Sequence, residues 1–232
     1  MLTQRSTEKE WIDLGPDYYT ELEYQQCMQK LFAVNRFLGF FADTKRILKQ
    51  FAETISVLDI GCGNGLFVLH LSKHYPNMQF KGTDISEAAI KLANSELQNW
   101  KIQKTTKISF EIPSQPQLTL PANSTDVILA TLLCHHLTDE QLSLFLQQSL
   151  QTCRQAVIIN DLHRHRIAYH LYRFLSPILF RNRLITHDGL ISIRRGFTRI
   201  EWQRVLKHAG ISHYKIQWRF PFRWRVILWK KL

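Results

Sequence analysis

The fold of this 232-residue chain follows from one stretch of its sequence, Val57-Leu58-Asp59-Ile60-Gly61-Cys62-Gly63-Asn64-Gly65. Its first four residues, three apolar and one acidic, are typical of a buried parallel strand. The glycines that follow allow the backbone to turn with positive φ and to approach a ligand without a Cβ in the way. The stretch therefore predicts a strand, a ligand-binding loop and the start of a helix.

The loop differs from the dinucleotide fingerprint G-x-G-x-x-G, whose third glycine would fall at Leu66. Asp59 precedes the first glycine by two positions, and its charge suits a cationic amino-acid group better than a pyrophosphate. The motif resembles that of class I S-adenosylmethionine-dependent methyltransferases. The resemblance implies that the methionine part of S-adenosyl-L-methionine is bound by Asp59, Gly61, Cys62, Gly63 and Gly65.

A second acid, Asp84, stands at the end of the next expected strand, where it can accept hydrogen bonds from both ribose hydroxyls. Ile85 follows it and is assigned to the same site. Methyltransferases of this class often carry an aspartate near the adenine amino group, and Ser114 and Gln115 occupy that place here. The adenine contact therefore departs from the family pattern.

Apolar, β-branched segments at 56–60, 78–83, 108–112, 126–132 and 156–160 alternate with stretches of helical period. This alternation favours a mainly parallel sheet flanked by helices. The ending differs, because 214–220 and 223–229 are typical of two antiparallel strands. We expect an α/β, Rossmann-like fold with a mainly parallel seven-stranded sheet and a C-terminal antiparallel strand pair.

Two regions lie outside this pattern. Residues 1–52 are expected to form a helical N-terminal cap, and 53–232 the methyltransferase core with a basic insertion at 162–197 after the fifth strand. Pro177 should break the helical character of this insertion, and 187–198 should form an ordered loop. The polar N-terminus lacks the apolar core of a secretory signal, so we expect a cytoplasmic protein.

Two histidines are candidate general bases, because imidazole titrates near neutral pH. His136 follows the fourth strand, and His163 follows the fifth, where Asp161 could orient it. Both positions lie at carboxyl ends of strands, where open sheets bind ligands. A histidine packed at the cofactor edge and a plain charged turn are the structural alternatives. The cysteines lie far apart without C-x-x-C spacing, and we expect reduced thiols and no metal.

Charge is concentrated in the last third of the chain. Residues 1–161 hold 14 Lys and Arg against 17 Asp and Glu, whereas residues 162–232 hold 16 against 2. We expect Arg164, Arg166, Arg194 and Arg195, interleaved with aromatic residues, to serve a small or membrane-associated acceptor. A solvated basic face is the alternative, and nucleic acid is disfavoured because no Asn-Pro-Pro-aromatic motif follows the fourth strand.

The segments 35–39, 160–166 and 187–198 resemble bacterial small-molecule O-methyltransferases found near type III polyketide synthases. The resemblance implies O-methylation of a phenolic or quinol oxygen, with an alkylated ring as one form of the acceptor. The apolar residues Phe37, Tyr169, Leu171 and Phe174 are candidates to enclose it. A nucleic-acid methyltransferase and a non-catalytic cofactor-binding or scaffold protein remain the alternatives. The sequence predicts neither the acceptor's identity nor the oligomeric state.

Overall fold

A computed structural model describes residues 2–100, 106–114 and 120–230. Among them a seven-stranded sheet has the order β3-β2-β1-β4-β5-β7-β6. The first five strands pair in parallel, and β7 pairs antiparallel with both β5 and β6. The strands are β1 (Ser56–Ile60), β2 (Gln79–Thr83), β3 (Ile108–Glu111), β4 (Thr125–Thr131), β5 (Cys153–Leu162), β6 (Tyr214–Arg219) and β7 (Arg223–Trp229). The expected Rossmann-like architecture and the terminal strand pair are confirmed.

Helices cover both faces of the sheet because alternate strand residues point to opposite sides. In β4, Val127 and Leu129 pack in one core cluster, whereas Ile128 and Ala130 pack in the other. The first cluster lies under α3 (Phe40–Leu48), α4 (Leu66–His74) and α5 (Glu87–Asn99). The second lies under α6 (Asp139–Thr152) and α9 (Arg199–His208). A short 3-10 turn, η1 (Cys134–His136), follows β4.

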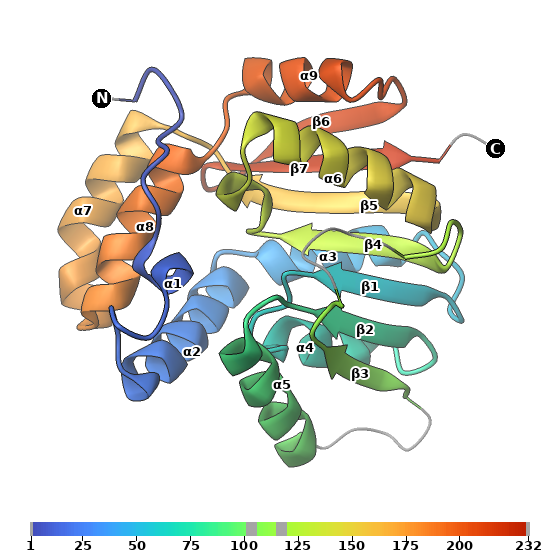
Figure 1. Cartoon of the computed structure of the whole chain (residues 1–232), viewed down its shortest axis with the longest axis horizontal. Helices are drawn as coiled ribbons and strands as arrows, with labels where there is room; N and C mark the ends of the chain where they lie inside the picture. Colours follow the sequence, from blue (N-terminus) through green and yellow to red (C-terminus); the bar gives the residue numbers. More distant parts are fainter. Residues whose placement is uncertain (1, 101–105, 115–119, 231–232) are drawn as a thin grey trace.

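The remaining helices gather beyond the carboxyl end of β4, at the left in Figure 1. They are α1 (Trp11–Leu14) and α2 (Glu21–Phe37) from the N-terminal region, and α7 (Arg166–Phe180) and α8 (Arg183–Arg195) from the insertion. Helix α8 contacts α1, α2 and α7, so two segments far apart in sequence form one helical layer. Within the N-terminal region, α3 instead packs into the core of the sheet.

The structure corrects two expectations for the insertion. Pro177 does not break α7, which continues to Phe180. The proline stands on an exposed face in the last turn, where the carbonyl that loses its amide partner can bind water. The segment expected as a loop is largely α8, which runs to Arg195. Its Gly189 lets α7 approach, since a Cβ there would lie 2.2 Å from Tyr172 Oη.

The four cysteines are free and buried. No helix in the described part of the chain combines the length and the apolar character that crossing a membrane requires.

Candidate functional site

The glycine loop joins β1 to α4 at the point where the strand order reverses. Gly61, Gly63 and Gly65 all have positive φ, and Gly65 at +71° is the N-cap of α4. A Cβ on Gly65 would lie 2.6 Å from the ring of Phe110, so the position excludes a larger side chain. A Cβ on Gly63 would meet only Met28 Sδ, at 3.7 Å. The loop is thus packed on one side and faces the pocket through Gly63.

Asp84 accepts hydrogen bonds from the backbone of this loop and from the N-cap of α5. Its Oδ2 accepts from Gly63 N at 2.9 Å, and its Oδ1 accepts from Ser86 N at 2.9 Å. Burial raises the pKa of Asp84, although the backbone N–H groups of Ser86 and Gly63 oppose this change. Asp84 lines the pocket beside the exposed side chain of Ile85. The carboxylate is therefore held in place at the edge of a ligand site.

Replacing Asp84 with Ala should weaken S-adenosylhomocysteine binding by about 1–3 kcal/mol, the cost of leaving buried hydrogen-bonding groups unpaired. Isothermal calorimetry measures the effect. Glu111→Ala, which removes an exposed carboxylate from the neighbouring strand, is the matched control and should bind like the unaltered chain. If both variants bound S-adenosylhomocysteine with equal affinity, the ribose contact would have to be assigned to another residue.

Buried polar atoms without a partner among the described residues supply a test of fit for the cofactor. Among these atoms, Asp59 Oδ1, Asn64 Nδ2 and Thr131 Oγ1 belong to residues that line the pocket around the glycine loop. Burial, reinforced by the charge of Asp84, raises the pKa of Asp59 to about 8. A cationic ammonium group and polar atoms of a ligand would satisfy these groups. S-adenosylmethionine carries both, so the residues fit it.

The adenine end of the expected site is less complete. Pro113 lines the pocket, but the exposed Ser114 does not. Gln115 lies outside the described residues. Cys62 lines the pocket with a buried thiol, whose pKa burial raises. Ile85 and Pro113 offer apolar contact at the place where the sequence led us to expect the adenine.

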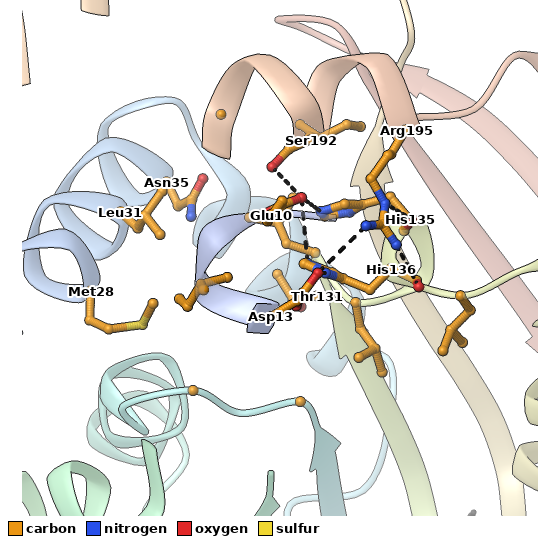
Figure 2. A pocket seen from close by; sticks show the side chains of 18 of the residues that line it. Glu10, Asp13, Met28, Leu31, Asn35, Thr131, His135, His136, Ser192 and Arg195 are labelled. Atoms are coloured by element: carbon orange, nitrogen blue, oxygen red, sulfur yellow. Dashed lines mark hydrogen bonds and ion pairs between the residues drawn. The ribbon is translucent and has the colours of Figure 1, made fainter. Parts of the chain in front are cut away.

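Helix α2 forms the opposite wall, which the sequence did not predict in detail. Met28, Leu31 and Asn35 project from this helix into the pocket (Figure 2). Tyr24 also lines it, and burial raises the pKa of its hydroxyl group. These α2 residues are spaced three or four positions apart, which is visible in the sequence. Any buried helix face has this spacing, so it does not by itself indicate a pocket.

A cluster of histidines and carboxylates lies at the end of β4 (Figure 2). His135 is buried, and its Nδ1 lies 2.8 Å from Asp161 Oδ1. His136 is half-buried, and its Nδ1 lies 3.0 Å from Asp13 Oδ2. Glu10, from the N-terminal segment, is buried between the two rings. His136 lines the pocket, as expected. No local sequence pattern predicted that Asp13 would be its partner.

The charges of this cluster support one another. Burial disfavours a protonated His135, but Asp161 and Glu10 outweigh it and raise the pKa of His135 to about 9. Burial likewise opposes ionisation of Glu10, yet His136 and His135 hold its pKa below the ordinary value. His135 is therefore cationic at neutral pH unless another cation takes its place, and it is a poor proton acceptor.

His163 lies apart from this cluster and does not line the pocket. Its Nδ1 accepts from Trp218 Nε1 at 3.2 Å, and Asp161 points to His135 instead. Burial, with His165 and Arg164 nearby, lowers the pKa of His163 to about 4. Of the two histidines expected to be catalytic, only His136 lies together with the other pocket residues.

The arginines of the insertion mostly bind the protein itself. Arg164 is buried and pairs with Glu201 at 2.6 Å, and Arg194 pairs with Glu8 at 2.7 Å. Arg195 is buried and donates to the carbonyls of His135 and His136. Arg166 alone of the four expected residues is exposed. Tertiary contacts thus hold the other three, of which Arg164 and Arg195 line the pocket and Arg194 does not, and a contact of these arginines with an acceptor stays a prediction.

The glycine loop, α2, the histidine cluster and part of α7 line one continuous cleft of about 3190 Å³. A single small-molecule site typically occupies roughly 300–1,000 Å³. The cleft therefore has room for a cofactor and a second molecule. Phe37 and Leu171 line it as expected, whereas Tyr169 and Phe174 do not.

Residues 57–156 match the family described as methyltransferase domain. Ajmaline N-methyltransferase of Rauvolfia serpentina is 28% identical over 122 residues, which are 53% of this chain and 38% of that protein. The chain spans between 14% and 38% of the length of the curated relatives it matches.

Solved structures share the fold over most of the chain. The plantazolicin methyltransferase BpumL in complex with SAH superposes with a TM-score of 0.67 and 22% identity, covering 96% of this chain and 93% of that one. A SAM-dependent methyltransferase from Aquifex aeolicus gives a TM-score of 0.66 at 18% identity, covering 91% and 98%. Residues 57–156 therefore match the methyltransferase-domain family, and the described chain shares the Rossmann-like fold of these solved methyltransferase structures.

Proposed function

We propose that this chain methylates an oxygen of a small phenolic or quinol-type molecule, with S-adenosylmethionine as the methyl donor. One observation carries the proposal: the Asp13–His136 pair lies in the same cleft as the glycine loop and Asp84. A base beside the donor site suits an acceptor whose proton must leave, and a phenol with a pKa near 10 is such an acceptor.

The bound cofactor supplies a methyl group on a sulfonium centre that is already electrophilic. The protein then has to hold both molecules in line and exclude water. Asp59, Asp84 and the glycine loop bind and orient the cofactor. His136, held through Nδ1 by Asp13, accepts the acceptor's hydroxyl proton on Nε2. The cationic His135 and Arg195 favour the resulting anion.

An apolar path leads from the cleft to the surface and suits an acceptor with an alkyl chain. Leu171, Leu175 and Leu179 line the cleft at four-residue spacing on α7. Phe37, from the end of α2, lines it as well and is 88% exposed. These side chains offer contact to an amphipathic molecule, because apolar surface is favourable to bury and otherwise costly to leave in water.

We also propose a peripheral contact of α7 with an anionic membrane surface. Ile167, Phe174 and Ile178 form an outward stripe, and their exposed fractions are 56%, 69% and 72%. Exposed arginines accompany the stripe, namely Arg166, Arg173 and Arg181. Apolar residues beside cations are the pattern of helices that lie in a membrane interface. Such a contact would deliver a lipid-like acceptor directly to the apolar path.

Phe174→Glu should lower partitioning to vesicles that contain phosphatidylglycerol by at least about tenfold, because the variant loses the 1.5–3 kcal/mol of burying a large apolar side chain. Co-sedimentation measures this partitioning. Ile112→Glu changes an exposed apolar residue beside β3 and should leave it unaltered. The membrane contact would be contradicted if the unaltered chain did not bind vesicles. It would also be contradicted if Phe174→Glu and Ile112→Glu bound them equally well.

Transfer of a labelled methyl group to a panel of phenols, quinols and total RNA tests the function itself. We expect transfer to a phenolic or quinol acceptor and none to RNA, since Arg164 and Arg195 are bonded within the protein. RNA that accepts methyl groups, and is bound with a steep loss of affinity as salt rises, would favour the nucleic-acid alternative. Cofactor binding without transfer to any acceptor would favour the non-catalytic alternative.

A further inference from the structure

Three side chains with metal-ligating atoms converge where the N-terminal segment crosses the end of β4. The ligating atoms of Glu10, His135 and His136 lie within 4.8 Å of one another. Glu10 Oε1 is 3.5 Å from His135 Nε2 and 3.9 Å from His136 Nε2. Both distances are too long for N–H···O hydrogen bonds, which are about 2.7–3.2 Å. The three atoms therefore surround a shared space instead of bonding directly.

The other ring nitrogen of each histidine is held by a carboxylate. Asp161 Oδ1 lies 2.8 Å from His135 Nδ1, and Asp13 Oδ2 lies 3.0 Å from His136 Nδ1. This arrangement leaves both Nε2 atoms directed at the side of Glu10 (Figure 2). Metal-ligating histidines almost always donate their second N–H to a carboxylate, a carbonyl or water in this way. Two such pairs at one place are difficult to explain by packing alone.

Hydrogen bonding within the cluster does not account for its geometry. Glu10 Oε1 already has Ser192 Oγ at 2.9 Å, and both imidazoles approach the same oxygen at longer range. A tetrahedral ion with bonds of roughly 2.0–2.2 Å holds its ligand atoms roughly 3.3–3.6 Å apart. The His135–Glu10 distance matches this separation, and the His136–Glu10 distance exceeds it by a few tenths of an ångström.

We propose that Glu10, His135 and His136 bind a divalent first-row transition metal ion such as Zn²⁺. Two imidazoles and one carboxylate are a ligand set for Zn²⁺, Fe²⁺ or Co²⁺, whereas Mg²⁺ prefers oxygen ligands alone. Three protein ligands leave a coordination position free, as in catalytic metal sites. All three residues line the cleft, so the free position is accessible from it.

The surrounding charges fit a doubly positive ion. Glu10, Asp13 and Asp161 contribute three negative charges, and Arg195 contributes one positive charge through contacts to the same turn. Arg5 also contacts this turn, but its charge is paired with that of Asp139. With both imidazoles neutral, a divalent ion makes this set electrically neutral.

The role of the ion rests on the proposed function. An acceptor hydroxyl at the free position would have its pKa lowered by the cation, and its proton would pass to solvent. His136 then serves as a ligand, and the cation replaces the imidazole as the group that favours the acceptor anion. A second oxygen next to the hydroxyl, as in catechols, would bind as a fifth ligand, since catalytic Zn²⁺ can expand from four to five ligands, and such acceptors would be favoured.

Titration of the chain, without a polyhistidine tag and saturated with S-adenosylhomocysteine, tests the site. We expect Co²⁺ to give the visible absorption of a tetrahedral site at one ion per chain, Zn²⁺ to displace it, and Mg²⁺ to have no effect. Glu10→Gln and His136→Gln should each weaken Co²⁺ binding at least about tenfold. Asp13→Asn, which leaves every ligand in place, should weaken it by about 10–100-fold. His74→Gln, at an exposed histidine on α4, should bind like the unaltered chain.

The outcomes separate the metal site from the methyltransferase. Chain that binds S-adenosylhomocysteine but shows no Co²⁺ absorption overturns the metal site and leaves the proposed function intact. Equal Co²⁺ affinity in the unaltered chain, Glu10→Gln and Asp13→Asn also overturns the site, and the last variant keeps this test valid if Glu10→Gln does not fold. Metal binding at these residues without methyl transfer to any acceptor supports the site and contradicts the proposed function.

Discussion

Gly65→Ala should destabilise the chain by about 2–5 kcal/mol and abolish measurable cofactor binding. Gly65 has a φ of +71°, and its Cβ would lie 2.6 Å from the buried ring of Phe110. A non-glycine residue in the left-handed region costs about 1–2 kcal/mol, and overpacking a core adds about 1–3 kcal/mol. Urea denaturation gives the free energy of unfolding, and calorimetry with S-adenosylhomocysteine gives the affinity.

Gly210→Ala separates the two contributions to this loss. Gly210 has the same φ of +71°, but nothing lies within 4 Å of the place that its Cβ would take. We expect this variant to lose only the backbone contribution of about 1–2 kcal/mol and to bind the cofactor normally. Equal losses of stability in the two variants would show that Phe110 moves away, and the packing argument for the loop would then fail.

His136→Ala should lower kcat by about 10²–10⁴-fold, the usual contribution of a positioned proton acceptor. The affinity for S-adenosylhomocysteine should change little, because the side-chain partners of His136 are Asp13 and Glu10, which are not among the residues expected to bind the cofactor. Asp13→Asn should lower kcat as well, since the amide no longer holds the ring as a carboxylate does. Steady-state kinetics with the acceptor found in the methyl-transfer assay measures both variants.

His163→Ala is the control for the loss of an imidazole near the end of a strand. Its ring bonds Trp218 and does not line the cleft, so we expect kcat within about twofold of the unaltered chain, a difference of only a few tenths of a kcal/mol. A large loss in His163→Ala together with full activity in His136→Ala would reverse the assignment of the base. Full activity in both variants would mean that the acceptor needs no proton acceptor from the chain.

Much of the cofactor site could be predicted from sequence because its determinants are local. The strand, the glycine loop and the following helix lie within Ser56–His74, and the steric requirements of Gly63 and Gly65 act on their immediate surroundings. Asp84 ends the neighbouring strand, and parallel pairing of β1 with β2 necessarily brings the two loops to one edge. A single glycine-rich motif thus predicts both the fold class and one wall of the cleft.

The insertion shows where local rules are insufficient. Pro177 and Gly189 disfavour helix when each is considered alone, yet both lie within helices. Gly189 makes room for Tyr172, and the hydroxyl of Tyr172 donates to Ile185 O at 2.5 Å. Packing between two helices therefore outweighs the intrinsic preference of single residues, which amounts to about 1 kcal/mol for glycine.

The sequence alone determined the fold class, the glycine loop and the position of Asp84, because strand pairing and backbone sterics act over short distances along the chain. Only the tertiary structure decided the partner of each histidine. Asp161 bonds His135 and not its sequence neighbour His163, and Glu10 and Asp13 reach the end of β4 from the other end of the chain. These pairs depend on how α1 and α8 pack over the sheet edge, and such long-range packing leaves no periodic or local signal in the sequence.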